Sequence, residues 1–555
     1  MIAVDRTPLE TDVLICGGGI AGLMAAIRGA DAGVKVVVAE KAHTRRSGSG
    51  SSGNDHFLCY IPDIQGKDLQ SLLRLGQDSI LGKFNDLSLL IRLFQESFAR
   101  VKDWEKWGIP MRPHGDWEFT GHAFPGKPRL WLKFEGADQK LTLTREALKR
   151  KVQIQNRFII TDVIAGDGGV IGAIGLSLQE EQPILRIFRA KTVILTTGSA
   201  NRLYPPVTPG MMFNTVYCPS CTGSGRAMAL RAGATLVNME IPNRHAGPKY
   251  FARAGKASWI GVFTDSFGKP VGPFVEKPTK DLGDITADIW NSVFTDMVRL
   301  GRGPVYLDCT RTSEEDLKYM MWGLRHEGAT AMLDYMGTEG IDVRQQRVEF
   351  TRYEPFLTGR GIEINEQGET TIEGLFAAGD EVGNLRAALA GAAVFGWIAG
   401  ERAAFRAKQV GSLSAAEKSP LVEERMDFFS EILARKEGAS WQEVNLALQQ
   451  IMNDYAGEVR SEPQLGVGVK YLRDLREKAL QTVKAPNAHK LMRALEIFDL
   501  MDCGEAIFLT ALERKESRPP HIRSDYPFTN PLLQDRFVTI RRKKDDWQVQ
   551  WRDRR

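Results

Sequence analysis

The stretch "VLICGGGIAG", residues 13–22, decides the fold at the start of this chain. Its first four residues are apolar or small and predict a buried strand, which runs into three consecutive glycines. The segment "IAGLMAAIRGADAG" then has the pattern of a helix, and Gly33 is placed to end it. "VKVVVAEK" follows as a second buried strand. Strand, turn, helix and strand in this order predict a β-α-β unit.

Gly17, Gly19 and Gly22 in this stretch form the spacing G-x-G-x-x-G. In a dinucleotide-binding fold these glycines allow the tight turn, the close approach of a pyrophosphate and the packing of helix on strand. The helix N-terminus attracts phosphates, and Glu40 at the end of the second strand is placed to accept from ribose hydroxyls. A glycine-rich turn without a ligand is the alternative. The residues expected to contact the nucleotide here are Gly17, Gly19, Ile20, Ala21, Gly22, Glu40 and Lys41.

Length and composition bound the class of protein. The chain has 555 residues, more than one compact domain usually holds, so two to four domains are expected. Its 73 basic and 69 acidic residues leave a net charge of +4, too balanced for nucleic acid to be the main partner. Six cysteines in so long a chain indicate a reducing compartment rather than a disulfide framework. With neither a signal peptide nor an apolar run of bilayer length, the sequence predicts a soluble cytoplasmic protein.

Two later segments indicate which dinucleotide binds. "AKTVILTTGSANRLYPP", residues 190–206, is a buried strand that ends in Thr-Thr-Gly, and "TTIEGLFAAGDEVGN", residues 370–384, is another that ends in Gly-Asp. The ends of parallel strands meet at one crevice, which is where open α/β sheets bind ligands. A short polar side chain such as Asp380 can hold a ribityl chain or a pyrophosphate there. The pattern predicts FAD on the first glycine turn, with further contacts from Thr197, Gly198, Gly379 and Asp380.

Further motifs extend across the chain: "TGSGRAMALRAGA", "GRGPVYLD", "YEPFLTG", "GLFAAGDEVG" and the C-terminal "RKESRPPHIRSDYP". With the first glycine stretch, they resemble the flavoprotein subunits of the fumarate reductase/succinate dehydrogenase superfamily, and most of all the α subunit of adenylylsulfate reductase. The resemblance implies an α/β fold with a two-piece Rossmann-like FAD-binding domain, an inserted α+β capping domain and a C-terminal helical domain. It also implies electron or hydride transfer at flavin N5, under the cap. The expected boundaries are 1–240 and 355–411 for the FAD-binding domain, 241–354 for the cap, 412–530 for the helical domain and 531–555 for a C-terminal tail.

The segment after the second strand departs from the family. Many members attach FAD covalently through a histidine there, whereas "RRSGSGSSGND" places Gly48 at that position. A glycine cannot form the link, so noncovalent FAD is expected. The residues expected to offer hydroxyls and amides to phosphate and flavin are Ser47, Ser49, Ser51, Ser52 and Gly53, with Leu389 and Ala392 as further cofactor contacts.

The catalytic positions of the known family activities also differ. The segment where fumarate-type enzymes carry a proton-delivering arginine reads "EKPTKDLGDITADIW", which contains none. "YEPFLTGRG" lacks the fumarate-type histidine, and Gly361 stands where adenylylsulfate reductases carry theirs. Because neither parent activity is supported at its catalytic positions, fumarate itself is not the expected substrate.

Two arginines and a tyrosine near the strand ends are candidates for the chemistry. Arg386 follows the Gly-Asp strand end and could grip a carboxylate or sulfonate beside the flavin, or pair with an acid such as Glu381. Arg360 and Tyr353 flank "EPFLTG", a segment that in this family faces the flavin from the cap hinge. A salt bridge at the hinge is the alternative for these two.

A second group of candidates leads into the cap. Arg244 and His245 lie in "MEIPNRHAGPK", and a histidine beside a flavin could supply a proton. A lone histidine is more often a hydrogen-bonded structural residue. Lys249, Arg253 and Lys256 follow as a basic run that would suit an anionic substrate, or equally a solvated surface.

Cys218 and Cys221 form Cys-Pro-Ser-Cys, which could be a redox pair or half a zinc site. No second such pair and no nearby histidine accompany them in the sequence, so two ordinary thiols are the favoured interpretation. Neither a metal site nor an iron–sulfur cluster is expected in this chain.

Together these patterns predict an FAD-dependent oxidoreductase that reduces an anionic or conjugated small substrate at flavin N5. Electrons are expected from an iron–sulfur or ferredoxin-like partner, because no second fingerprint for a nicotinamide nucleotide is evident. The alternatives are adenylylsulfate-reductase-like sulfur chemistry and a subunit whose flavin only relays electrons within a larger complex.

Overall fold

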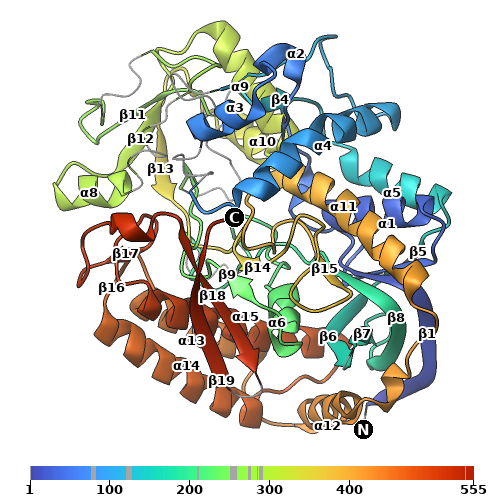
Figure 1. The fold of residues 1–555 in the computed structure, drawn as a ribbon. Helices are drawn as coiled ribbons and strands as arrows, with labels where there is room; N and C mark the ends of the chain where they lie inside the picture. Colours follow the sequence, from blue (N-terminus) through green and yellow to red (C-terminus); the bar gives the residue numbers. More distant parts are fainter. Residues whose placement is uncertain are drawn as a thin grey trace.

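The computed structural model divides into three visible parts (Figure 1). A sheet with covering helices lies at the right, a smaller group of strands and helices lies at the upper left, and long helices run along the lower left. The structure describes residues 2–76, 83–120, 128–166, 168–208, 212–249, 259–272, 277–283, 286, 290, 292–543 and 546–555.

A seven-stranded sheet forms the centre of the first part. β1 (Ala3–Cys16) lies between β2 (Val36–Glu40) and β8 (Ile184–Leu195), and all three strands run parallel. β5 (Gln153–Asn156) pairs in parallel with β2, and β15 (Leu375–Ala377) pairs in parallel with the last residues of β8. The carboxyl ends of β1, β2, β8 and β15 therefore gather at one edge, as the sequence predicted.

β6 (Phe158–Gly166) and β7 (Gly169–Ser177) extend this sheet as antiparallel strands beside β8. The residues of β6 and β7 are buried along most of both strands, so this end of the sheet also lies inside the protein. The other elements before residue 240 are η1 (Ser49–Ser52), β3 (His56–Leu58), α2 (Pro62–Gln65), α3 (Leu69–Gly76), α4 (Leu87–Lys106), β4 (Trp131–Lys133), α5 (Gln139–Lys149), α6 (Ser224–Arg231) and β9 (Leu236–Val237).

α1 (Ile20–Asp31) and α11 (Ala388–Gln409) pack side by side against this sheet (Figure 1). A Cβ atom on Gly396 would lie only 2.4 Å from the carbonyl oxygen of Ala21, and Gly400 is similarly close to α1. The small residues of α11 thus let the two helix backbones touch. Both helices begin at the edge where the parallel strands end, so their N-termini face the predicted nucleotide.

The second part is built on a separate antiparallel sheet. Its strands follow the order β10-β13-β12-β11, and β12 lies within the motif "GRGPVYLD". Trp259 and Phe263 each pack edge-to-face against Phe350, with ring centroids 5.4 and 5.5 Å apart, in a core of their own. All of these elements fall within the predicted capping segment, whose limits stay a prediction. They are β10 (Ala246–Pro248), β11 (Val262–Thr264), α8 (Val293–Arg299), β12 (Val305–Asp308), α9 (Glu314–His326), α10 (Thr330–Thr338) and β13 (Val348–Arg352).

Four long helices form the third part, which confirms the predicted helical region. α13 begins with a capping box, in which Ser440 and Glu443 satisfy each other's backbone amides. α15 is buried along most of its length because α13, α14, α6 and the C-terminal strands pack around it. The helices are α12 (Pro420–Ala434), α13 (Trp441–Tyr455), α14 (Glu462–Thr482) and α15 (Ala488–Glu513).

The last residues, predicted as a C-terminal tail, form a hairpin. β18 (Arg536–Lys543) pairs with β19 (Asp546–Asp553) and also with β9, which in turn pairs with β14 (Gly361–Ile362). Burial of Phe537, Val538 and Ile540 holds β18 in place. Two short strands, β16 (Val459–Arg460) and β17 (Ile522–Arg523), pair nearby. Among the residues described, no helix is both long enough and apolar enough to cross a bilayer.

Candidate active site

The glycine turn after β1 has the geometry that a dinucleotide requires. Gly17 has φ of +107°, and a Cβ atom there would lie 2.4 Å from the carbonyl oxygen of Thr196. At Gly22 a Cβ atom would lie 1.9 Å from the carbonyl oxygen of Gly17, so only glycine fits. Gly19 differs, because among the described residues a Cβ atom there would meet only one oxygen within 4 Å, at 3.9 Å. Neighbouring backbone atoms leave no room for a side chain at Gly17 and Gly22. Space remains at Gly19, where a pyrophosphate would approach.

Glu40 and Lys140 place opposite charges at this turn. The Glu40 carboxylate accepts from Gly18 N and from Ala42 N, each at 2.7 Å, and it keeps lone pairs for a ribose hydroxyl. Lys140 on α5 donates to the carbonyl oxygen of Gly18, and burial lowers the pKa of its ammonium to about 8. This lysine was not predicted from the sequence. It brings a positive charge to the place where phosphates are expected.

Lys41 lies at the end of β2, where the sequence predicted a nucleotide contact. Its Nζ binds Glu496 of α15 at 2.8 Å, and Arg202 Nη2 binds the other oxygen of that carboxylate at 2.6 Å. Burial alone would raise the pKa of Glu496, but the charges of Lys41, Arg202 and Arg493 lower it to about 2. Lys41 therefore ties the flavin-binding sheet to the helical region, and its contact with a nucleotide stays a prediction.

The serine-rich segment passes over the start of α1. Gly48 has φ of +75°, and a Cβ atom on it would lie 3.8 Å from Gly19 Cα, next to the open turn. In the described part of the chain, the hydroxyls of Thr44 and Ser47 are buried and have no hydrogen-bond partner. Buried hydroxyls without partners are unusual in native proteins and fit a site that a cofactor completes. Ser49, Ser51 and Ser52 lie on the 3-10 turn η1, which continues this segment to Gly53.

The ends of β8 and β15 are joined by hydrogen bonds at the crevice. Thr196 Oγ1 donates to the carbonyl oxygen of Gly17 at 2.7 Å, which ties β8 to the glycine turn. Thr197 N and Oγ1 donate to the Glu381 carboxylate at 3.1 and 2.7 Å, and burial raises the pKa of Glu381 to about 7. The acid considered as an alternative partner of Arg386 is thus held by Thr197. Gly198 and Gly379, with φ of +86° and +87°, turn the two strand ends.

Arg226 on α6 fastens the predicted segments to one another, although it was not singled out as a site residue from the sequence. Its fully buried guanidinium donates to the carbonyl oxygens of Gly198 at 2.8 Å, Arg360 at 2.7 Å and Asp380 at 2.6 Å. It also reaches the carbonyl oxygen of Leu357 at 3.3 Å. One side chain thereby holds the two strand ends and the "EPFLTG" segment in register. Its position among apolar and small residues in "GSGRAMA" was the available signal, because a buried arginine needs partners.

Arg386 lines a hollow at this same edge, together with Gly359, Gly379, Asp380 and Phe395. A Cβ atom on Gly359 would lie 2.4 Å from Arg386 Cβ, so the glycine leaves room for the arginine. Arg386 N donates to Asn85 Oδ1 at 2.8 Å, which fixes its backbone. Burial raises the pKa of Asp380 in this hollow. A guanidinium in such a position could bind an anion beside a cofactor that occupies the strand ends.

Arg360 lies behind this hollow and is only 2% exposed. It donates to the carbonyl oxygens of Ile241, at 3.1 Å, and of Gly359. Burial, and next the charge of Arg386, lower the pKa of Arg360 to about 9. Arg360 and Arg386 are therefore close enough to repel each other, and backbone groups already occupy much of the guanidinium of Arg360.

His245, Arg244 and Tyr353 form a second group at the entrance to the cap. His245 Nε2 lies 3.2 Å from Tyr217 Oη, and its ring stacks on Phe356 at 5.4 Å. Tyr353 is buried and donates from its hydroxyl to the carbonyl oxygen of Pro248 at 2.8 Å. Burial, and next the charge of Arg352, lower the pKa of Arg244 to about 10.

The basic run after His245 is described only in part. Lys249 pairs with Glu349 on β13 at 2.7 Å, as a partly exposed ion pair. Arg253 and Lys256 lie outside the described residues, as does part of the "EKPTKDLGDITADIW" segment. The surface interpretation therefore fits Lys249.

Cys218 and Cys221 share one tight turn, in which Cys221 N donates to the carbonyl oxygen of Cys218 at 3.0 Å. Neither thiol takes part in a disulfide within the described residues. A hydrogen bond to Cys218, and next burial, raise the pKa of Cys221 well above its usual value. Because the thiolate is the reactive form, this environment favours the interpretation as ordinary thiols.

The fold and the crevice define the chain as an FAD-dependent oxidoreductase. Residues 12–394 match the FAD binding domain family, and residues 445–553 match the fumarate reductase flavoprotein C-terminal family. The chain belongs to the fumarate reductase/succinate dehydrogenase flavoprotein family, which confirms the resemblance seen in the sequence.

Individual relatives agree with this assignment. One subunit of the fumarate reductase (CoM/CoB) of Methanothermobacter marburgensis is 26% identical over 97% of this chain and 98% of its own length. Among solved structures, adenylylsulfate reductase from Archaeoglobus fulgidus has a TM-score of 0.83 at 23% identity and covers 99% of this chain and 96% of its own. E. coli quinol fumarate reductase FrdA has a TM-score of 0.81 at 22% identity, over 100% of this chain and 97% of its own. At these identities the structures show the shared fold alone.

Proposed function

We propose that this FAD-dependent oxidoreductase reduces a small anionic or conjugated substrate that Arg386 holds beside the flavin, under the cap. The supporting observation is the position of Arg386 in the hollow where β8 and β15 end, against Gly359 and together with Asp380. A guanidinium binds a carboxylate or sulfonate through two parallel, charge-assisted hydrogen bonds. Arg360 is the less suitable anchor, because it is not among the residues that line this hollow.

The residues around the crevice fit FAD. The open side of Gly19, the buried hydroxyls of Thr44 and Ser47, and the ammonium of Lys140 offer room, donors and positive charge. Bound there, FAD would supply two-electron chemistry at its flavin ring. The remaining work belongs to the chain, which holds the anionic end of the substrate and sets its orientation. Noncovalent attachment stays our prediction, because Gly48 offers no side chain for a link.

His245 is the side chain proposed to hold the proton that the substrate takes up. Its Nε2 meets Tyr217 Oη at 3.2 Å, and stacking on Phe356 fixes the plane of its ring. Imidazole groups commonly exchange protons near neutral pH. Arg244 next to it would add positive charge on the same side as an incoming anion.

The packing around Gly361 disfavours sulfur chemistry of the adenylylsulfate reductase type, because those enzymes carry a histidine at this position. Gly361 has φ of +148°, and a Cβ atom there would lie 2.5 Å from both Arg226 Nε and the carbonyl oxygen of Glu381. A histidine cannot stand at this position unless the hydrogen bonds of Arg226 move. The departure from the adenylylsulfate reductase pattern is therefore built into the packing of the strand ends.

Electron relay by the flavin, as part of a larger complex, is the second candidate. The supporting observation is that this chain matches the Methanothermobacter relative over nearly its whole length. That relative is one subunit of its enzyme. In that arrangement an iron–sulfur or ferredoxin-like partner would exchange electrons with the flavin. Steady turnover by the isolated chain with an artificial dye donor would favour the enzyme, and reduction without turnover would favour the relay.

The proposal is tested by reoxidation of the reduced flavin under anaerobic conditions with a panel of unsaturated carboxylates and sulfonates. At least one should reoxidise the wild-type flavin, and Arg386→Lys should slow that reaction tenfold or more at unchanged FAD content, corresponding to roughly 1.5–3 kcal/mol. Arg406→Lys is the matched control, since Arg406 lies on α11, which begins two residues after Arg386, and pairs with Glu373 at the surface. Equal rates in wild type and Arg386→Lys would remove Arg386 from the site.

A further inference from the structure

The loop that carries Arg386 is held by a short segment just before α4. Asn85 Oδ1 accepts from Arg386 N at 2.8 Å, and Asn85 Nδ2 donates to the carbonyl oxygen of Arg386 at 3.3 Å. One amide side chain therefore bonds both backbone polar groups of the proposed substrate anchor. Asn85 is 1% exposed, so loss of its amide would leave these backbone groups without a ready partner in water.

The residue after Asn85 bonds the same loop at a second point. Asp86 N donates to the carbonyl oxygen of Asn384 at 2.9 Å, and Asn384 Nδ2 donates to Asp86 Oδ2 at 2.8 Å. Asp86 is also 1% exposed, and the side chain of Asn384 is buried. The segment before α4 and the loop before α11 thus lie side by side, bonded at two successive points.

The end of the C-terminal hairpin holds this segment in turn. Arg552 on β19 binds the Asp86 carboxylate with both terminal nitrogens, Nη1 to Oδ1 at 2.9 Å and Nη2 to Oδ2 at 2.7 Å. Arg554 Nε donates to the carbonyl oxygen of Asn85 at 2.7 Å. A two-pronged pairing of guanidinium and carboxylate fixes direction as well as distance. Hydrogen bonds therefore run without a break from β19, through Asn85 and Asp86, to Arg386.

The backbone beside Arg386 is strained and needs such support. Ala388, the first residue of α11, has φ of +44°. A residue other than glycine keeps a left-handed conformation only where the surrounding contacts impose it. On its other side Arg386 packs against Gly359, where a Cβ atom would lie 2.4 Å from Arg386 Cβ. Arg386 is thus held between Gly359 and the segment before α4.

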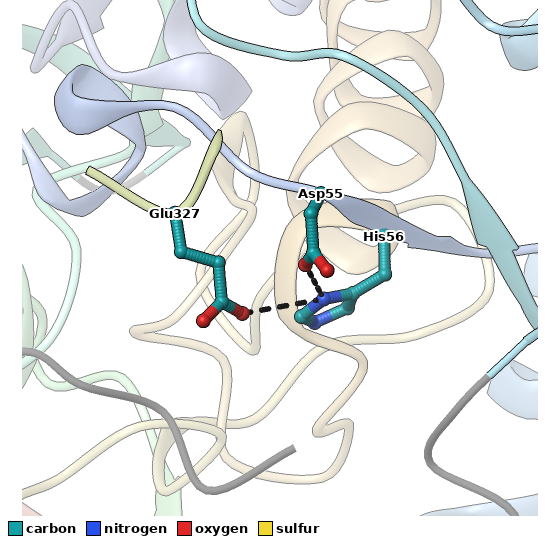
Figure 2. Close-up of side chains that lie close together, drawn as sticks. All are labelled: Asp55, His56 and Glu327. Atoms are coloured by element: carbon teal, nitrogen blue, oxygen red, sulfur yellow. Dashed lines mark hydrogen bonds and ion pairs between the residues drawn. The ribbon is translucent and has the colours of Figure 1, made fainter. Parts of the chain in front are cut away.

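The cap is joined to the flavin-binding part at a different place. Figure 2 shows the carboxylates of Asp55 and Glu327 directed at the His56 ring, and Glu327 Oε1 lies 3.5 Å from His56 Nδ1. Asp55 precedes β3, and Glu327 follows the last residue of cap helix α9. None of these three residues belongs to the segments that hold Arg386. The hydrogen bonds that fix Arg386 therefore lie outside this cap contact.

We propose that Asn85 is a positioning residue for Arg386 and that Arg552 supports it from the hairpin. The end of β19 thereby sets where the guanidinium of Arg386 meets an anion. A binding group must be held close to its productive geometry, because small displacements of a binding side chain cost affinity. This inference rests on the proposed function, since it concerns the anion that Arg386 is proposed to bind.

The test measures the affinity of the oxidised, FAD-loaded protein for malonate or a small disulfonate, followed through the flavin absorption spectrum. Asn85→Ala removes both hydrogen bonds to Arg386 and should weaken anion binding about fivefold or more. Arg552→Lys keeps the charge but loses the two-pronged contact, and should weaken binding about threefold or more. Because both residues act through Arg386, adding either change to Arg386→Ala should weaken binding no further.

The matched control is Arg425→Lys. Arg425 on α12 binds Asp162 on β6 with Nε at 2.9 Å and Nη2 at 3.1 Å, which is another two-pronged contact with a buried carboxylate. This variant should lose stability as Arg552→Lys does, yet bind the anion like the wild type. FAD content shows whether each variant has folded. Should Asn85→Ala lose its FAD, the milder Arg552→Lys decides.

The outcomes separate this inference from the proposed function. If the wild type binds none of the anions, or Arg386→Ala binds them equally well, the proposed function fails and the inference fails with it. If Arg386→Ala binds weakly but the FAD-loaded Asn85 and Arg552 variants bind like the wild type, the inference alone is overturned. It is also overturned if Arg425→Lys weakens binding as much as Arg552→Lys, or if the double variants bind more weakly than Arg386→Ala.

Discussion

Replacing Arg226 by lysine tests how the strand ends of the cofactor crevice are held together. The guanidinium donates to four backbone carbonyls, at 2.6 to 3.3 Å, from three separate segments of the chain. A lysine ammonium is a single point that cannot reach all of them, so at least two buried carbonyl oxygens lose their partner. Each buried polar group left unsatisfied costs about 1–3 kcal/mol, which predicts a loss of about 2–6 kcal/mol in the free energy of unfolding.

The assay is denaturant-induced unfolding of Arg226→Lys, combined with measurement of its affinity for FAD. The variant should also bind FAD more weakly, because the carbonyls of Gly198 and Asp380 lie at the two strand ends where FAD is expected. Arg406→Lys, which alters a partly exposed ion pair, should change stability by less than about 1 kcal/mol. The reasoning fails if Arg226→Lys is as stable as Arg406→Lys and retains FAD equally well.

Three other predictions follow from the same crevice. Gly22→Ala should abolish FAD binding, because its Cβ atom would lie 1.9 Å from the carbonyl oxygen of Gly17; a variant that purifies fully yellow would contradict this. Acid precipitation should release FAD into the supernatant because Gly48 cannot form a histidyl link, whereas flavin retained in the pellet would show a covalent bond. Burial raises the folded-state pKa of Glu381 from 4.5 to about 7, so the folded chain keeps a proton that the unfolded chain has lost in this interval. The wild type should therefore lose stability, relative to Glu381→Gln, as pH rises through this window, and parallel Tm profiles between about pH 5 and pH 8 would exclude it.

The sequence predicted the parts of the fold that depend on short-range patterns. The β1-α1-β2 unit, β8 and β15 were expected because apolar patterns and glycine spacing are local signals, and the helices after residue 412 were expected from the family resemblance. The hairpin of β18 and β19 was expected only as a tail. Its partner β9 lies about 300 residues earlier in the chain. Pairing between strands so far apart produces no local sequence pattern from which it could be predicted.

In the site, as in the fold, the sequence predicted the residues that belong to local motifs. The glycines, Glu40 and the Gly-Asp strand end all lie at the crevice, because each belongs to a motif with its own local spacing. Lys140 and Arg226 were missed because their partners are backbone carbonyls more than a hundred residues away, apart from Gly198.

Our central claim is that Arg386 holds an anion beside the flavin, and an inert ligand tests it most directly. A saturated dicarboxylate such as malonate, or a small disulfonate, is titrated into the oxidised FAD-loaded protein while the flavin absorption spectrum is recorded. At least one of these anions should perturb the spectrum in a saturable way. Arg386→Ala should weaken its binding by about tenfold or more, whereas Arg406→Lys should bind it like the wild type. A wild-type spectrum indifferent to every anion, or equal affinity in Arg386→Ala, would contradict the claim.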